Sequence, residues 1–167
     1  MPQLTPMHDG AWPRRAALLT LACLAGGCGS LAALPGASLF GPRIALSDLR
    51  LEVAREANDN TPLRVELVAP RDEELLATLL GLSAAQWFDP LANYRRDHPD
   101  TLRSWDYELP PGATLHLKPA PFAGAKAAGL VLFANYKGKG AYRLRLDTYR
   151  RAVVSFGALD ASVDGAR

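Results

Sequence analysis

Cysteine is almost absent from this 167-residue sequence, which holds two, Cys23 and Cys28, both within its first 28 residues. The remainder can therefore form neither a disulfide nor a thiolate metal site. Histidine is scarce as well, and His98 and His116 show no H-x-x-x-H spacing that would make a pair of metal ligands. We expect no metal, no cofactor, and a domain held together by its apolar core.

An excess of either charge is also missing. The sequence has 19 basic and 17 acidic residues, and taking Arg14, Arg15 and Asp9 away with the first 27 residues leaves 17 and 16. A near-neutral chain gives no electrostatic reason to expect nucleic acid as a partner. Glycine motifs that cradle phosphate and G-x-S-x-G elbows are lacking too. The sequence indicates that the protein is not an enzyme.

No hydrophobic run is long enough to cross a bilayer, which takes roughly 20 residues. The run at 16–25 has ten residues, follows Arg14-Arg15 and leads into Gly26-Gly27-Cys28. This order is typical of a secretory signal peptide. Leu24-Ala25-Gly26-Gly27-Cys28 also resembles the lipobox of bacterial lipoproteins, which implies cleavage before Cys28 and acylation of its thiol. Cys23 is a competing site, and a plain signal peptide is the alternative.

The residue after Cys28 is Gly29 rather than Asp, which implies sorting to the outer membrane, on its periplasmic face. We therefore expect a signal peptide over 1–27 and a lipid-anchored tether, broken by Gly and Pro, over 28–42. Translation can start at Met1 or at Met7, and the sequence leaves both open.

Beyond the tether, apolar and polar residues alternate in short runs, the period of half-buried strands. Between the second and third runs, residues 71–98 change to a helical period, with Asp72 as a cap and a capping box at Ser83 and Gln86. Gly81 is expected just past the end of the first helix, and Asp89-Pro90 is expected to restart a helical turn through Leu91. The end from Asp160 is expected to be loose. The pattern predicts a mainly β domain over 43–160, a β-sandwich of about seven to eight strands with a short helical insertion. The strand runs are 44–54, 62–68, 105–109, 115–117, 129–136, 142–146 and 152–156, and the run at 129–136, the most apolar of them, is expected to be a central strand.

Two polar turns are candidates for binding a partner, because strands hold the ends of sandwich loops rigidly while their tips stay exposed. One contains Asn58, Asp59, Asn60 and Thr61, and the other contains Lys137 and Lys139. Ordinary turns are the alternative for both. Asp59 does not predict a cation site, because one short loop supplies too few oxygens.

The order of these motifs resembles a known family. The polar loop leads into NDNTPLRV at 58–65, WDYELPPG follows at 105–112, and GLVLFANY at 129–136 precedes a hairpin return. Together with the lipobox, they look like the outer-membrane lipoprotein of the type VI secretion membrane complex, the TssJ/SciN/VasD family. The resemblance implies a transthyretin-like β-sandwich. It also implies that acyl chains fix the domain to the outer membrane while the sandwich binds the periplasmic domain of an inner-membrane, TssM-type protein.

Two other function classes stay open. Another periplasmic ligand-binding or inhibitor lipoprotein would have an aromatic concave surface that includes Trp105 and Tyr107. A hydrolase would need carboxylates clustered around His98 or His116.

Overall fold

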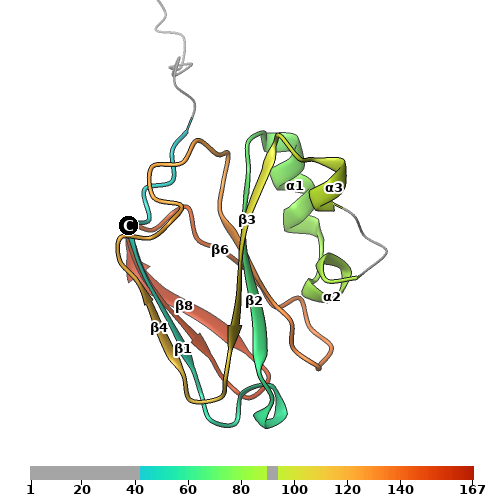
Figure 1. The fold of residues 1–167 in the computed structure, drawn as a ribbon, viewed down its shortest axis with the longest axis vertical. Helices are drawn as coiled ribbons and strands as arrows, with labels where there is room; N and C mark the ends of the chain where they lie inside the picture. Colours follow the sequence, from blue (N-terminus) through green and yellow to red (C-terminus); the bar gives the residue numbers. More distant parts are fainter. Residues whose placement is uncertain (1–41, 90–93) are drawn as a thin grey trace, which may run out of the picture. The chain divides into compact units, whose positions relative to one another are not determined.

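The computed structural model describes residues 42–89 and 94–167. Within them, eight strands form two four-stranded sheets, which confirms the mainly β sandwich (Figure 1). The expected signal peptide, Cys28 and the expected tether up to residue 41 lie outside the described residues, as does the helical turn expected at Pro90 and Leu91.

The first sheet has the strand order β4-β1-β7-β8. Its central strand β1 (Asp48–Val53) pairs antiparallel with β4 (Thr114–Leu117) and parallel with β7 (Arg151–Phe156). The edge strand β8 (Ala161–Ala166) pairs antiparallel with β7. The inward-facing residues Leu49, Leu51 and Val53 of β1 and Val154 and Phe156 of β7 are buried, as the alternating sequence predicted.

The second sheet has the strand order β3-β2-β5-β6, with every pair antiparallel. The strands are β2 (Leu63–Pro70), β3 (Leu102–Leu109), β5 (Val131–Ala134) and β6 (Arg143–Arg145). All four residues of β5 are buried, because the core covers one face of this strand and the helical insertion covers the other. The apolar run at 129–136 predicted this central position.

Several expected boundaries were wrong: the strand expected from 105 begins at Leu102, and the largest differences lie at the two ends of the domain. The end from Asp160 is not loose, because β8 pairs with β7 over six residues, from Phe156 opposite Ala161 to Arg151 opposite Ala166. The strand expected over 44–54 begins only at Asp48: the preceding residues Ile44 and Leu46 are buried in the core, but the backbone of Ile44 bonds to the loop residues Gly124 and Ala125 rather than to a neighbouring strand.

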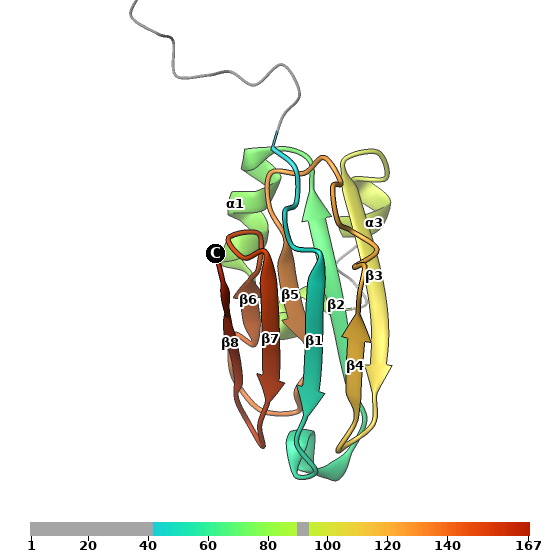
Figure 2. The ribbon, with the colours of Figure 1, turned by 90° about the vertical axis from the view of Figure 1, so that its left-hand side faces the viewer.

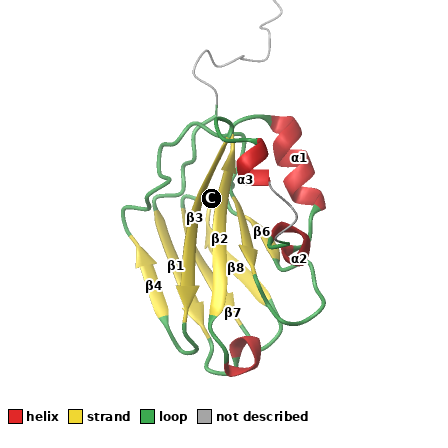
Figure 3. Ribbon diagram, turned by 45° about the vertical axis from the view of Figure 1, so that its right-hand side comes forward, coloured by secondary structure: helices red, strands yellow, loops and turns green. Residues whose placement is uncertain are grey.

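In the described residues of the insertion, three helices, α1 (Glu73–Gly81), α2 (Ala84–Trp87) and α3 (Tyr94–Asp97), lie on one side of the sandwich (Figure 3). Both predicted caps are confirmed. The Asp72 side chain accepts from the backbone N–H of Leu75 at 2.7 Å, and Ser83 and Gln86 form the reciprocal capping box. Gly81 closes α1 rather than following it, and Leu82 is the C-cap.

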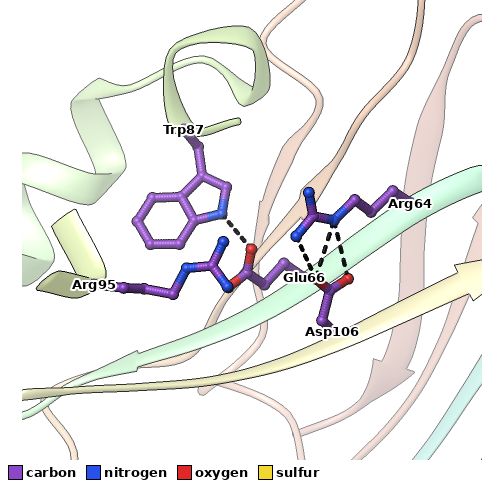
Figure 4. A network of polar contacts seen from close by, with 5 residues as sticks. All are labelled: Arg64, Glu66, Trp87, Arg95 and Asp106. Carbon is purple, nitrogen blue, oxygen red and sulfur yellow. Dashed lines mark hydrogen bonds and ion pairs between the residues drawn. The ribbon is translucent and has the colours of Figure 1, made fainter. Parts of the chain in front are cut away.

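A buried carboxylate joins the insertion to the second sheet (Figure 4). Glu66 on β2 is 0% exposed and accepts a hydrogen bond from Trp87 Nε1 at 2.9 Å. Its other oxygen accepts no hydrogen bond from the described residues but lies 3.4 Å from Arg95 Nη1 in α3. The Trp87 ring stacks on Phe133 at 5.1 Å and on Tyr94 at 5.8 Å. A charge pair and an aromatic stack therefore fix α2 and α3 to the sheet.

The sandwich has two distinct ends (Figure 2). The described chain enters at one end, passes through 42–47 and runs along β1. The loop that follows β1, residues 54–62, lies at the opposite end. We call these the entry end and the loop end.

Candidate functional site

The two polar turns singled out in the sequence lie side by side at the loop end. The Asn58 Oδ1 atom accepts from the backbone N–H of Lys137 at 2.8 Å, which joins the loop 54–62 to the β5–β6 connection, residues 135–142. The backbone N–H of Asn58 donates to Ala158 O at 3.1 Å, which adds the β7–β8 turn. The β3–β4 turn joins through Gly112 N–H and Ala54 O at 3.3 Å. One surface thus replaces two separate candidates.

The loop 54–62 makes a left-handed turn. Asn58, Asp59 and Asn60 have φ values of 48°, 59° and 54°. Asn and Asp tolerate this region better than other residues with a side chain, which is the local reason for the sequence Asn-Asp-Asn. The turn confirms the interpretation of Asp59 as a turn residue, and it presents Asp59 and Asn60 to solvent.

Asn58 is the residue that holds this turn together. Its side chain is 3% exposed, and its Nδ2 atom donates to Thr61 Oγ1 at 3.0 Å and to Pro62 O at 3.1 Å. Thr61 Oγ1 in turn donates to Asn58 O at 2.7 Å. Asn58 and Thr61 therefore position the loop from within, and the atoms available to a partner are those of Asp59 and Asn60.

Leu159 supplies an apolar centre to the same surface. It is the one large hydrophobic side chain among the described residues that is strongly exposed, at 62%. A Cβ atom at Gly138 would lie 3.3 Å from Leu159 Cδ2, so the lysine hairpin packs directly against this side chain. Lys137 and Lys139 are exposed on either side of that glycine. We call Asp59, Asn60, Lys137, Lys139 and Leu159 the loop-end surface.

A buried tyrosine supports the surface from beneath. Tyr136 Oη lies 2.9 Å from Gly157 O and 2.8 Å from Asp160 O, within reach of a hydrogen bond to either, and its ring stacks on Tyr142 at 4.5 Å. Burial raises the pKa of the Tyr136 phenol, and the nearby Asp160 carboxylate adds to that effect. The hydroxyl is therefore a proton donor throughout the physiological range, and it ties the β7–β8 turn to the lysine hairpin.

Replacement of Asn58 by aspartate is expected to lower the free energy of unfolding by about 1–3 kcal/mol, because a carboxylate cannot donate to Thr61 and Pro62 and is costly to bury. Urea denaturation followed by circular dichroism measures this change. The neighbouring Asn60→Gly variant is the control, with an expected change within about 0.5 kcal/mol, since Asn60 is exposed and glycine accepts its positive φ. Equal stability of the Asn58→Asp and wild-type proteins would contradict the role given to Asn58.

Among the other polar residues considered in the sequence, His116 belongs to an ion-pair cluster on the outer face of the first sheet. His116 Nε2 lies 2.7 Å from Asp48 Oδ1, and Lys118 Nζ lies 2.9 Å from Asp48 Oδ2. No group of three or more potential metal ligands occurs within 42–89 and 94–167. Trp105 is half-buried and packs edge-on against Phe122 at 5.5 Å, at the border of the core, and the Arg103 guanidinium lies 5.7 Å from the centre of its ring.

The sequence pointed to six loop-end residues but did not find Leu159 or Tyr136. Tyr136 was read as the end of an apolar strand, and a lone leucine in GALD carries no pattern. The sequence could not identify Leu159, because its place beside Lys137 and Lys139 is visible only in the folded structure.

In the described part of the chain, no helix has the length and apolar character needed to span a membrane.

Neither a protein-family model nor a curated protein matches this sequence. Solved structures do match. The type VI secretion lipoprotein TssJ1 from Pseudomonas aeruginosa has a TM-score of 0.56 at 17% identity, over 72% of this chain and 95% of that one. Lip from Serratia marcescens, a membrane-bound component of the type VI secretion system, has a TM-score of 0.50 at 14% identity, over 72% and 99%. A chain of a structure described as the TssM C-terminal domain from EAEC has a TM-score of 0.53 at 12% identity, over 70% and 98%.

The matches cover nearly the full length of these neighbours, so the shared fold is the whole sandwich. The chain is a two-sheet β-sandwich of the class found among type VI secretion proteins. More particularly, it is TssJ-like in fold, and the resemblance predicted from its motifs is confirmed at that level.

Proposed function

We propose that this chain is the outer-membrane lipoprotein of a type VI secretion membrane complex, where it anchors the trans-envelope complex by binding the periplasmic domain of an inner-membrane TssM-type protein. The observation that carries the proposal is a fold shared over 95% of the length of a type VI secretion lipoprotein, in a chain with a lipobox-like segment ending at Cys28.

In this proposal the anchor is the acylated Cys28, on the periplasmic face of the outer membrane. One acyl chain gives only marginal membrane binding, whereas the several chains of a lipoprotein give a stable hold. The role is mechanical rather than catalytic, which agrees with polar residues that serve as caps, turns and ion pairs.

The docking site in this proposal is the loop-end surface. Its centre is an exposed apolar side chain, Leu159, with charged and amide groups around it, the arrangement of a hydrophobic anchor inside a polar rim. Four backbone connections are tied to one another beneath it, so the surface is preorganised and loses little entropy when a partner binds. The solved structure described as the TssM C-terminal domain from EAEC contains a chain with this fold. This match supports a TssM-type protein as the partner.

A pull-down from envelope extracts tests the proposal. The acylated full-length protein, tagged at its C-terminus and solubilised in mild detergent, is expected to retrieve a large inner-membrane protein with a periplasmic domain. An Ala77→Glu variant, which changes an exposed position on α1, is expected to retrieve it equally well. Recovery of outer-membrane components alone would contradict the proposed function.

A further inference from the structure

The entry end of the sandwich carries an excess of positive charge. Segments 42–47, 118–128 and 148–151 meet there, through bonds such as Ile44 N–H to Ala125 O at 3.0 Å and Ser47 N–H to Arg150 O at 3.1 Å. These three segments contain no carboxylate side chain. Their exposed cations, which we call the entry patch, are Arg43, Lys118, Lys126, Arg150 and Arg151.

Little of this charge is neutralised within the domain. Asp48, at the border of the patch, pairs with Lys118 at 2.9 Å and with His116 at 2.7 Å, and hydrogen bonds from Lys118 and then His116 lower the pKa of Asp48. Arg43 donates to the Gly124 carbonyl at 2.8 Å, which leaves its charge unpaired. For Lys126, Arg150 and Arg151, the described residues provide no ion-pair partner.

The excess is confined to one part of the molecule. Across the entry end, the turns beside α1 hold Arg71 together with Asp72 and Asp100, so the charge there is balanced or slightly negative. The four connections of the loop end carry as many carboxylates as cations, with Arg55, Lys137 and Lys139 against Glu56, Asp59 and Asp160. Of the three regions compared, the entry patch is therefore the one with an excess of cations over carboxylates, and it lies where the described chain begins, at residue 42.

We infer that the entry patch contacts the anionic phospholipid headgroups of the membrane that holds the acyl chains. The inference rests on the proposed acylation of Cys28, because residues 28–41 then keep the entry end within about 50 Å of the bilayer, given an extended length of about 3.3–3.6 Å per residue. A short tether raises the effective concentration of the patch at the membrane. Each cation near an anionic surface strengthens the contact roughly fivefold.

This contact orients the domain relative to the membrane. With the entry patch on the headgroups, the loop-end surface faces away from the membrane, since the two lie at opposite ends of β1 (Figure 2). The lipid surface thus orients the docking site toward a partner that approaches across the periplasm, and no additional protein is needed to hold it there.

A fluorescence measurement on the acylated full protein tests the inference. Because the chain from Cys28 onward has no other cysteine, an Ala123→Cys variant takes a single dye at an exposed position between Lys118 and Lys126. The protein is reconstituted in vesicles of phosphatidylcholine alone or with one third phosphatidylglycerol, and neutral acrylamide quenches the dye. We expect quenching to fall at least threefold in the phosphatidylglycerol vesicles, and the protection to disappear at 0.5 M NaCl.

Two double variants with the same change in charge separate the inference from a general effect of charge. Lys126→Glu/Arg150→Glu is expected to abolish the protection, and Lys137→Glu/Lys139→Glu at the loop end is expected to keep it. Equal quenching in the two kinds of vesicle, or equal loss of protection in the two variants, overturns the inference. Flotation of the same samples with phosphatidylcholine vesicles reports acylation separately, so a failed anchor is distinguished from a failed patch.

Discussion

Reversal of the charges at Lys137 and Lys139 together with Leu159→Asp is expected to weaken binding of the proposed inner-membrane partner at least about 30-fold, since a central anchor side chain contributes about 2 kcal/mol or more to a protein interface. Leu159 is 62% exposed and packs against the lysine hairpin, so the three substitutions change one continuous surface. Titration calorimetry with the partner's purified periplasmic domain at 0.15 M salt measures the loss.

The control for this prediction is the Lys126→Glu/Arg150→Glu variant, which makes the same double charge reversal at the opposite end. It is expected to bind the partner domain within about twofold of wild type, because surface charges separated by much more than a Debye length of about 8 Å are screened. If the control weakens binding as much as the loop-end variant, the docking surface has been assigned to the wrong end.

Replacement of Trp87 by alanine is expected to lower the free energy of unfolding by about 3–5 kcal/mol, in the range of large-to-small changes at buried aromatic residues. The ring lies between Phe133 and Tyr94, and its indole N–H is the hydrogen-bond donor to the buried Glu66 carboxylate. Its removal creates a cavity. It also takes a hydrogen bond from the buried Glu66 carboxylate, which keeps its ion pair with Arg95 at 3.4 Å. Denaturant unfolding followed by circular dichroism measures the change.

The two contributions of Trp87 can be separated. Trp87→Phe keeps an aromatic ring but loses the N–H donor, and it is expected to cost about 1.5–3 kcal/mol, the value of a hydrogen bond to a charged group. Adding Glu66→Leu to Trp87→Phe removes the buried charge and is expected to restore part of the loss. A double variant less stable than Trp87→Phe alone would contradict the assignment of the cost to an unsatisfied carboxylate.

The parts of the fold that depend on residues close together in the sequence were predictable. Asp72 and the Ser83–Gln86 pair identified two helix starts because a cap needs residues only three positions apart. The buried run around Val131–Ala134 identified a central strand because both of its faces are apolar. These signals lie within one element, so no knowledge of the rest of the fold is needed to read them.

The last strand was missed because its stability is not local. Ala161–Ala166 contains one large apolar residue, Val163, and its alternation of apolar and polar residues covers only the four residues from Ala161 to Asp164. Its order comes from the β7 backbone, which is already fixed in the sheet and supplies the hydrogen-bond partners. The formation of such an edge strand depends on the neighbouring strand that it pairs with more than on its own residues.

At the candidate site, too, some features were predictable from the sequence and others depend on the fold. Asn-Asp-Asn indicated a tight turn correctly, since these residues tolerate positive φ. That Asn58 is buried and binds the backbone of Lys137, 79 positions away, depends on how the two sheets are connected. The sequence therefore supplied candidate residues, whereas only the structure separated those that hold the loop from those that face solvent.

Metabolic labelling with radioactive palmitate, combined with membrane fractionation, is the most direct test of the central claim that this sandwich is fixed to the outer membrane. The account predicts that the wild-type protein incorporates the label and sediments with outer membranes, and that the Cys28→Ser protein does neither. A wild-type protein that stays unlabelled, or a Cys28→Ser protein that remains in the outer-membrane fraction, would contradict it.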